Sequence, residues 1–245
     1  MARIRIDQAL VMHGMVKSRS QADSYIKLGM VELSDKVIKK SGQFIDESQI
    51  ENLKITTEKQ YVSRAALKLE SVIDKFNLNF KGKTVLDVGS STGGFTQLAL
   101  LNGAKKVIAV EKGVDQMESS LRHDPKISLH EKTDIVNFSY SDPIDIVVID
   151  VSFVSLKDIL PSIYALVDGK TEVVAMVKPQ FEATSSGLKH KGVIKNEKMR
   201  RDIFKEFEAW VSKKFFILNK ADSAVSGAKG NTERFYLLRK VDLTV

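Results

Sequence analysis

The spacing of apolar and polar residues divides the chain into a short first part and a longer second part. In the first part, two stretches carry apolar residues at helical spacing and end at a glycine: Ile6, Ala9 and Leu10 before Gly14, then Ala22, Tyr25 and Ile26 before Gly29. Residues 30–45 alternate loosely, with turn residues at Ser34-Asp35 and Ser41-Gly42, which predicts short strands. The pattern stops near Ile55, so we predict a small α+β domain over residues 1–58 and a larger domain over residues 59–245.

The second part alternates between predicted strands and predicted helices. Five strands are predicted: TVLDVG, KVIAVE, ISLHEK, IDIVVID and EVVAMVKP. Helical segments such as FTQLALLNG and LKDILPSIYAL lie between them. This order is typical of a parallel sheet with helices on both faces. Residues 195–214 form a further amphipathic helix, and FFILNKADSAV and ERFYLLRKV add two final strands. The predicted fold class is therefore α/β.

The composition narrows the class of protein. With 43% hydrophobic and 28% charged residues, it is typical of a soluble globular chain. The absence of cysteine removes disulfides, thiolate nucleophiles and cysteine-bound zinc or iron-sulfur sites. The N-terminus lacks a signal-peptide pattern, and no apolar run approaches the roughly 20 residues that cross a bilayer. We expect a cytoplasmic protein with no membrane or metal site, and we favour a monomer.

The net charge of +7 is concentrated in the last third of the chain. Residues 178–245 carry 15 basic and 8 acidic side chains, whereas residues 61–177 carry 13 and 15. A basic face attracts phosphate backbones or anionic lipids. Many mildly basic proteins bind neither of these, so the charge alone does not identify a partner.

A glycine-rich turn, Asp87-Val-Gly-Ser-Ser-Thr-Gly-Gly-Phe-Thr96, lies between a predicted strand and a predicted helix, where a ligand can approach the backbone. A dinucleotide site would have G-x-G-x-x-G, but this turn has G-x-x-x-G-G after an acidic residue. That carboxylate repels a pyrophosphate and pairs with a partly cationic ligand such as S-adenosylmethionine (AdoMet). The candidate cofactor contacts are Asp87, Gly89, Ser91, Gly93, Gly94, Phe95, Glu111 for the ribose and Asp134 for the adenine. Alternatively, the glycines serve packing, and both later acids are solvated strand ends.

Four ionisable residues lie where ligands bind or where the periodicity favours an apolar side chain. Lys68 falls on the apolar stripe of the helix predicted in SRAALKLESVIDKF, with Ser63 as its N-cap. Asp150 and Lys178 end predicted strands, and Glu233 begins the last one. Methyl transfer to an alcohol needs a base, and repulsion between two lysines favours a neutral one, for which we choose Lys178. Taken singly, each residue is equally explained as a structural lysine or a solvated strand end.

Seven segments together carry a family resemblance. RIDQALV, KSRSQADSYIKLGMVEL, YVSRAALKL, DVGSSTGGFT, VIDVSF, VKPQFE and GNTERF stand in the order and spacing of the TlyA family of haemolysin-named rRNA methyltransferases. The first two segments resemble the RNA-binding domain named after ribosomal protein S four, and the others resemble FtsJ-type ribose methyltransferases. The resemblance implies an S-four-like RNA-binding domain over residues 1–58 and an FtsJ-like domain with a Rossmann-like fold over residues 59–245.

The resemblance also implies an activity, namely AdoMet-dependent 2′-O-methylation of ribose in ribosomal RNA (rRNA), with cytidine as the usual base. The partner is then rRNA or a ribosomal subunit. The family's Lys-Asp-Lys-Glu tetrad falls on Lys68, Asp150, Lys178 and Glu233. Two positions depart from the FtsJ pattern: Thr92 stands where proline is frequent, and Glu111 where Asp is common. Both concern the region that would hold the sugar of the cofactor.

Basic residues at two places are candidate RNA contacts. One group flanks the starts of the two N-terminal helices, where side-chain charge and helix N–H groups can bind phosphates together. The other group lies in the basic segment 189–201, whose alternative role is a solvated helix face. The candidates are Arg3, Arg5, Lys17, Arg19, Lys189, Lys191, Arg200 and Arg201.

Two other functions compete with methyl transfer. A membrane-lytic haemolysin is poorly supported, because the chain has no spanning segment and only one tryptophan. A catalytically idle RNA-binding or ribosome-assembly factor would share the fold. An idle protein has no reason to keep four charges that converge on one crevice, so the complete tetrad favours an enzyme.

Overall fold

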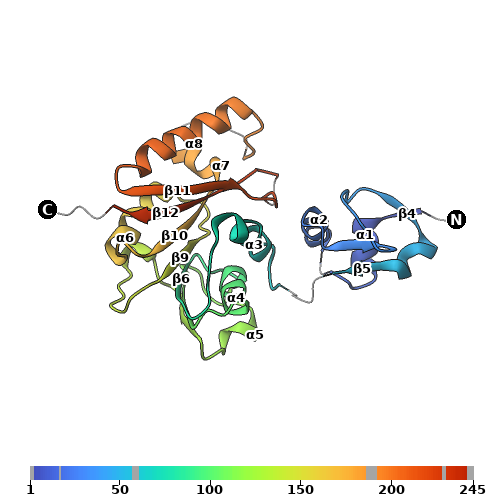
Figure 1. Cartoon of the computed structure of the whole chain (residues 1–245), viewed down its shortest axis with the longest axis horizontal. Helices are drawn as coiled ribbons and strands as arrows, with labels where there is room; N and C mark the ends of the chain where they lie inside the picture. The colour runs from blue at the N-terminus through green and yellow to red at the C-terminus, as the bar shows by residue number, and fades with distance from the viewer. Residues whose placement is uncertain (1–2, 17, 57–60, 186–191, 228–229, 242–245) are drawn as a thin grey trace.

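The computed structural model describes residues 3–16, 18–56, 61–185, 192–227 and 230–241, which form a small N-terminal part and a larger part built on one sheet (Figure 1). In the N-terminal part, α1 (Ile6–Met12) packs against α2 (Arg19–Lys27). A short strand not predicted from the sequence, β1 (Arg3–Arg5), pairs with β4 (Phe44–Asp46). β2 (Val31–Leu33) lies between β3 (Lys36–Val37) and β5 (Leu53–Ile55), and the 3-10 helix η1 (Glu47–Asn52) precedes β5.

The turn between β2 and β3 has the geometry that the sequence predicts. Ser34 and Asp35 both have positive φ angles, 49° and 63°. A two-residue turn of this kind matches the right-handed twist of the strands on either side. The predicted order of two short helices followed by short strands is therefore present.

The larger part is built on a seven-stranded sheet with the order β11-β12-β10-β9-β6-β7-β8. Its five parallel strands are β6 (Thr84–Val88), β7 (Lys106–Val110), β8 (Ile127–His130), β9 (Ile146–Ile149) and β10 (Glu172–Val177). β12 (Arg234–Lys240) runs antiparallel to both β10 and β11 (Phe215–Asp222). The predicted α/β class is confirmed.

Helices cover both faces of this sheet (Figure 1). α3 (Arg64–Phe76) and α4 (Gly94–Leu101) pack on one face, against side chains such as Val85 and Val107. α6 (Leu156–Leu166) and α8 (Glu197–Val211) pack on the other face, against side chains such as Leu86 and Ile108, which follow Val85 and Val107 in the sequence. Because neighbouring strand residues point to opposite faces, a sheet covered on both sides requires the unbroken apolar runs seen in the sequence.

The N-terminal part and α3 share a hydrophobic core. Tyr25 on α2 and Tyr61 before α3 are both about 2% exposed and belong to one cluster with residues of both parts. The Tyr61 hydroxyl donates a hydrogen bond of 2.7 Å to Glu70 of α3. The helix that carries Lys68 therefore also contacts the N-terminal part.

Besides β1, three local features differ from the sequence predictions. A short helix, α7 (Pro179–Ser185), follows β10 directly, where we expected only the end of a strand. The helical stretch expected between β7 and β8 is a single turn, α5 (Ser119–Arg122). Ser63 occupies the N-cap position of α3, but its hydroxyl makes no capping hydrogen bond.

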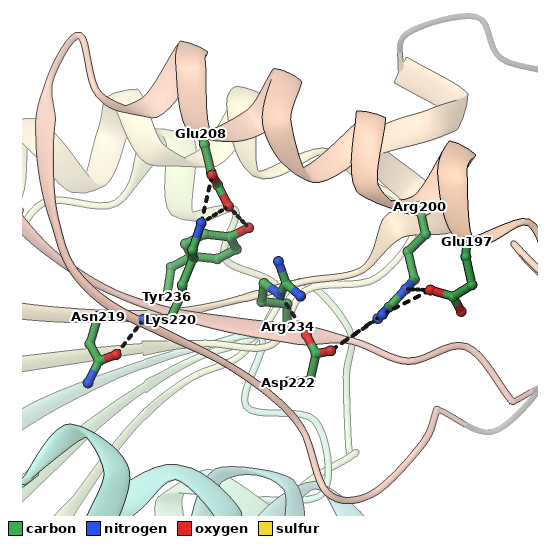
Figure 2. Close-up of polar contacts among 8 residues, drawn as sticks. All are labelled: Glu197, Arg200, Glu208, Asn219, Lys220, Asp222, Arg234 and Tyr236. Atoms are coloured by element: carbon green, nitrogen blue, oxygen red, sulfur yellow. Dashed lines mark hydrogen bonds and ion pairs between the residues drawn. The ribbon is translucent and has the colours of Figure 1, made fainter.

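Two groups of charged and polar side chains anchor α8 to the antiparallel end of the sheet (Figure 2). In the first, Asp222 of β11 accepts a hydrogen bond of 2.6 Å from Arg234 and pairs with Arg200 of α8 at 3.3 Å. In the second, Glu208 of α8 pairs with Lys220 at 2.8 Å and accepts a hydrogen bond of 2.9 Å from the Tyr236 hydroxyl. These contacts fix the start of β12, where Glu233 lies.

Candidate functional site

The glycine-rich turn after β6 is shaped by close contacts with its neighbours. Gly89 has a φ angle of +79°, and a Cβ atom there would lie 2.8 Å from the backbone oxygen of Asp150. At Gly94, a Cβ atom would lie 2.3 Å from Ser63 Oγ, because α3 and α4 approach each other closely. Gly93, at the N-cap of α4, has a φ angle of +89°. Packing alone thus requires glycine at these positions, and their contact with a cofactor stays a prediction.

A cavity of about 500 Å³, here called the cofactor cavity, adjoins this turn. Of the predicted cofactor residues, it brings together Gly89, Ser91, Glu111 and Asp134. The Glu111 carboxylate accepts hydrogen bonds from the backbone N–H groups of Ser91 at 2.9 Å and Gly113 at 2.6 Å. Glu111 is therefore held in the lining of the cavity by the glycine-rich turn and by the loop after β7.

Asp134 has a structural role in the absence of any ligand. Its carboxylate pairs with Lys112 at 2.9 Å and caps the 3-10 helix η2 (Ile135–Asn137) through the Val136 N–H group at 3.1 Å. The Lys112 ammonium lowers the pKa of Asp134. Contact with an adenine would add to these interactions.

Asp87 lies beneath the turn and is fully buried. The hydroxyl of Thr96 donates a hydrogen bond of 2.6 Å to Oδ2, whereas Oδ1 has no hydrogen-bond partner in the described part of the chain. Burial raises the pKa of Asp87 to about 7 and outweighs the hydrogen bond from Thr96, and the carboxylate of Asp150 nearby also raises it. Asp87 lines a second, smaller cavity of about 300 Å³ together with Phe95, Lys68 and Lys178.

The four ionisable residues singled out in the sequence form two buried ion pairs. Lys68 Nζ lies 2.6 Å from Glu233 Oε2, and Lys178 Nζ lies 2.5 Å from Asp150 Oδ1. The Lys178 ammonium also donates a hydrogen bond of 2.8 Å to the hydroxyl of Ser152. All four side chains are at most 14% exposed. The structure thus brings together one residue of α3, one residue just before β12 and the residues that follow two parallel strands.

A third cavity of about 660 Å³, here called the acceptor cavity, opens beside the tetrad and is lined by Lys68, Lys178 and Glu233. One wall is Phe153, which is 91% exposed and has a φ angle of +65°. Its ring lies 5.1 Å from that of Phe181. A bulky residue with positive φ is strained, and such strain is often found at functional sites. Sequence reasoning did not single out Phe153, although it stands in the VIDVSF segment.

Glu182 is a buried carboxylate that the sequence analysis also missed. It lies on α7 and accepts hydrogen bonds from the Ser155 hydroxyl at 2.5 Å and the Leu156 N–H group at 2.8 Å. Burial raises its pKa. Glu182 thereby fastens the loop after β9, which carries Asp150 and Phe153, to the helix that follows Lys178.

Two of the predicted RNA contacts of the N-terminal part pair with a buried acid. Asp7 is 4% exposed and pairs with Arg5 at 3.0 Å and Arg19 at 2.8 Å. Arg3 is exposed, and its guanidinium lies 6.0 Å from the ring of Phe44. Lys17 lies outside the described residues. Asp7 therefore orients two of the predicted arginines, and their contact with RNA stays a prediction.

The predicted contacts of the C-terminal third are less uniform. Arg201 is exposed, whereas the Arg200 side chain is only 14% exposed and pairs with Asp222 and Glu197 (Figure 2). Arg200 therefore serves first to anchor α8. Lys189 and Lys191 lie outside the described residues.

Neither a metal site nor a membrane span is found in the part of the chain that the structure describes. No group of His, Asp and Glu side chains there could hold a metal ion. No helix among the same residues is long and apolar enough to cross a bilayer.

Comparison with known proteins points to the same family as the seven sequence segments. Residues 61–240 match the FtsJ-like methyltransferase family. The chain is 36% identical to a candidate rRNA methyltransferase, YqxC, from Bacillus subtilis, over 94% of this chain and 83% of the relative. It is 31% identical to the 16S/23S rRNA (cytidine-2′-O)-methyltransferase TlyA from Mycobacterium tuberculosis, over 97% and 90%. The solved structure of a candidate hemolysin from Streptococcus thermophilus matches with a TM-score of 0.71 and 32% identity, over 99% of this chain and 90% of that one. The chain is therefore a member of the TlyA family of FtsJ-like methyltransferases.

Proposed function

We propose that this protein transfers a methyl group from AdoMet to the 2′-hydroxyl of a cytidine in rRNA. The observation that carries the proposal is that two buried ion pairs lie beside the acceptor cavity. Lys68 pairs with Glu233, and Lys178 pairs with Asp150. The name of the relative from Mycobacterium tuberculosis supports both rRNA and cytidine. With rRNA as its substrate, the protein would act in the cytoplasm.

The residues of the cofactor cavity, together with Asp87 in the adjoining smaller cavity, fit AdoMet. Glu111 follows a parallel strand, where Rossmann-like proteins hold the ribose hydroxyls with an acid. Asp87 Oδ1, buried and without a hydrogen-bond partner among the described residues, can pair with the cationic end of the ligand. When bound, AdoMet supplies an activated methyl group. The same carboxylates would repel the pyrophosphate of a dinucleotide.

The tetrad supplies a proton acceptor for the ribose hydroxyl. Asp150 and Ser152 hold the side chain of Lys178 in one place, and Glu233 does the same for Lys68. We assign Lys178 as the base that takes the 2′-hydroxyl proton, after its own proton has passed to Asp150 or to solvent. Lys68, still charged, would stabilise the developing oxyanion.

The surroundings of the tetrad fit a nucleotide taken out of its stack. Bases of single-stranded RNA commonly stack on exposed aromatic side chains. Phe153 offers such a ring at the edge of the acceptor cavity. We assign residues 1–58 to an RNA-binding domain that brings the rRNA to this site. Arg3 and the two arginines held by Asp7 would contact phosphates there, and Arg201 would do so on α8.

The test is to incubate the protein with labelled AdoMet and separated ribosomal subunits or naked rRNA, and to map the modified nucleotide. We expect a 2′-O-methylcytidine in rRNA. A dye-release assay on liposomes, run in parallel, tests the membrane-lytic alternative. Dye release without methyl incorporation would overturn the proposal. RNA binding without methyl incorporation on any rRNA would instead identify an idle assembly factor.

A further inference from the structure

The acceptor cavity extends beyond the tetrad to the start of α6. Its lining includes Asp158, in the first turn of that helix, as well as Lys178 and the two phenylalanines. A volume of about 660 Å³ lies within the roughly 300–1,000 Å³ of sites that enclose small ligands. The cavity therefore has room for a base as well as for the ribose that must reach the tetrad.

The aromatic rings indicate where that base would lie. The Phe181 ring is close to both Lys178 and Phe153, because it lies 5.9 Å from Lys178 Nζ and 5.1 Å from the ring of Phe153. A base stacked on Phe153 would keep its ribose near Lys178. Its hydrogen-bonding edge would then face the polar lining of the cavity.

Asp158 is a free hydrogen-bond acceptor in that lining. Its side chain is exposed and makes no hydrogen bond or ion pair with the residues that the structure describes. The start of α6 is satisfied by other groups, because the Ser155 hydroxyl caps Lys157 N–H at 3.1 Å and Glu182 accepts from Leu156 N–H. The carboxylate of Asp158 thus has no bonding task within the described protein.

We propose that Asp158 is a specificity-determining residue that accepts a hydrogen bond from the 4-amino group of the target cytosine. This inference rests on the proposed function. An ionised carboxylate only accepts hydrogen bonds, so it pairs with the amino group of cytosine and repels the O4 carbonyl oxygen of uracil. The site would therefore both favour cytidine and disfavour uridine, which otherwise has the same size and stacks in the same way.

The plainer role of an acid in a first helical turn is to interact favourably with the helix dipole. That role predicts a small loss of stability on substitution, with no change in the choice of base. The ratio of methylation rates on cytidine and uridine separates the two roles, because it does not depend on how much of the protein is folded.

The experiment uses rRNA transcripts that carry either C or U at the nucleotide mapped for the parent protein. Asp158→Asn keeps the shape of the side chain but adds a donor, which can bond to O4 of uracil. We expect its ratio of kcat/KM for C over U to fall by about tenfold or more relative to the parent. The control is Asp142→Asn, which changes an exposed acid outside the three cavities and should leave the ratio unchanged.

A second substrate tests the same contact from the RNA side. Replacing the target cytosine by 2-pyrimidinone, which lacks the 4-amino group, should slow the parent protein by about tenfold and leave Asp158→Ala almost unaffected. A ratio for Asp158→Asn within twofold of the parent's, or equal sensitivity of Asp158→Ala and parent to 2-pyrimidinone, would overturn the inference while leaving the proposed function intact. Absence of any ribose methylation by the parent would overturn both.

Discussion

Lys178 is the residue on which the chemistry depends most directly. We expect Lys178→Ala to reduce methyl transfer by at least about a hundredfold, the lower end of what a positioned base contributes. Lys178→Arg should fail as well, because a guanidinium stays protonated and cannot accept the hydroxyl proton. Methyl incorporation under single-turnover conditions measures both effects, and calorimetric titration with AdoMet checks that the cofactor still binds. Near-parental turnover by Lys178→Arg would refute the assignment of this lysine as the base.

Asp87 makes the stability of the protein depend on pH. Its pKa rises from an ordinary value of 3.8 to about 7 on folding, so between these values the folded protein holds a proton that the unfolded chain has released. The free energy of unfolding should therefore fall as the pH rises through this window. Asp87→Asn cannot titrate and should remove this contribution. Urea denaturation of both proteins at several pH values measures the difference, and parallel pH profiles would show that Asp87 does not titrate in this range.

The tetrad could be predicted from the sequence because parallel strands end at the same edge of a sheet, so Asp150 and Lys178 had to lie close together. Lys68 was marked by its place on an apolar stripe. Nothing comparable marked Phe153 or Glu182. Both residues take part in contacts between the loop after β9 and α7, the ring contact of Phe153 with Phe181 and the hydrogen bonds of Glu182, and such contacts are not a local property of the sequence.

The helix α7 was not predicted, although a local signal for its first residue is present in the sequence. Pro179 is its first residue, a position where proline is favoured because its missing N–H group would be unpaired anyway. The apolar run of β10 leads directly into this proline, so the sequence indicated the end of a strand equally well. The sequence therefore allowed two interpretations after Lys178: the strand simply ends, or a helix begins at Pro179. In the structure the helix forms and packs against α8.

The anchoring of α8 predicts a measurable loss of stability. In Asp222→Asn, the side chain keeps its shape but loses the charge that binds Arg234 and Arg200. Hydrogen bonds to charged groups contribute about 1.5–3 kcal/mol, so the free energy of unfolding should fall by an amount in that range. Asp202→Asn, which changes an exposed acid on α8, is the control and should change the free energy of unfolding by no more than about 0.5 kcal/mol. Equal denaturation midpoints for the two variants would mean that the ion pairs of Asp222 in Figure 2 contribute nothing to stability.

At the scale of the whole molecule, we propose that residues 1–58 bind RNA and that the larger part transfers the methyl group. This predicts what happens when residues 1–58 are removed. The shortened protein keeps Tyr61 and all of α3, and so retains Lys68. Loss of one of two tethered RNA contacts removes the gain in effective concentration, so methylation at low RNA concentration should fall by roughly a hundredfold or more. At saturating RNA the difference should narrow, and AdoMet affinity should stay the same. Identical site choice and apparent RNA affinity in the shortened protein would show that the N-terminal part has another task.

Because β12 lies between β10 and β11, the order in which the chain is synthesised limits when the tetrad can form. Lys68 lies on the first helix of the larger part, whereas its partner Glu233 immediately precedes the last strand. A chain still emerging from the ribosome can form the neighbouring strands that line the cofactor cavity, but β11 cannot join the sheet until β12 is made. A chain that ends after α8, unfinished or cut by a protease, would thus lack Glu233, the partner of Lys68 in the tetrad. The ion pair between Lys68 and Glu233 can therefore form only after both ends of the larger part have been synthesised.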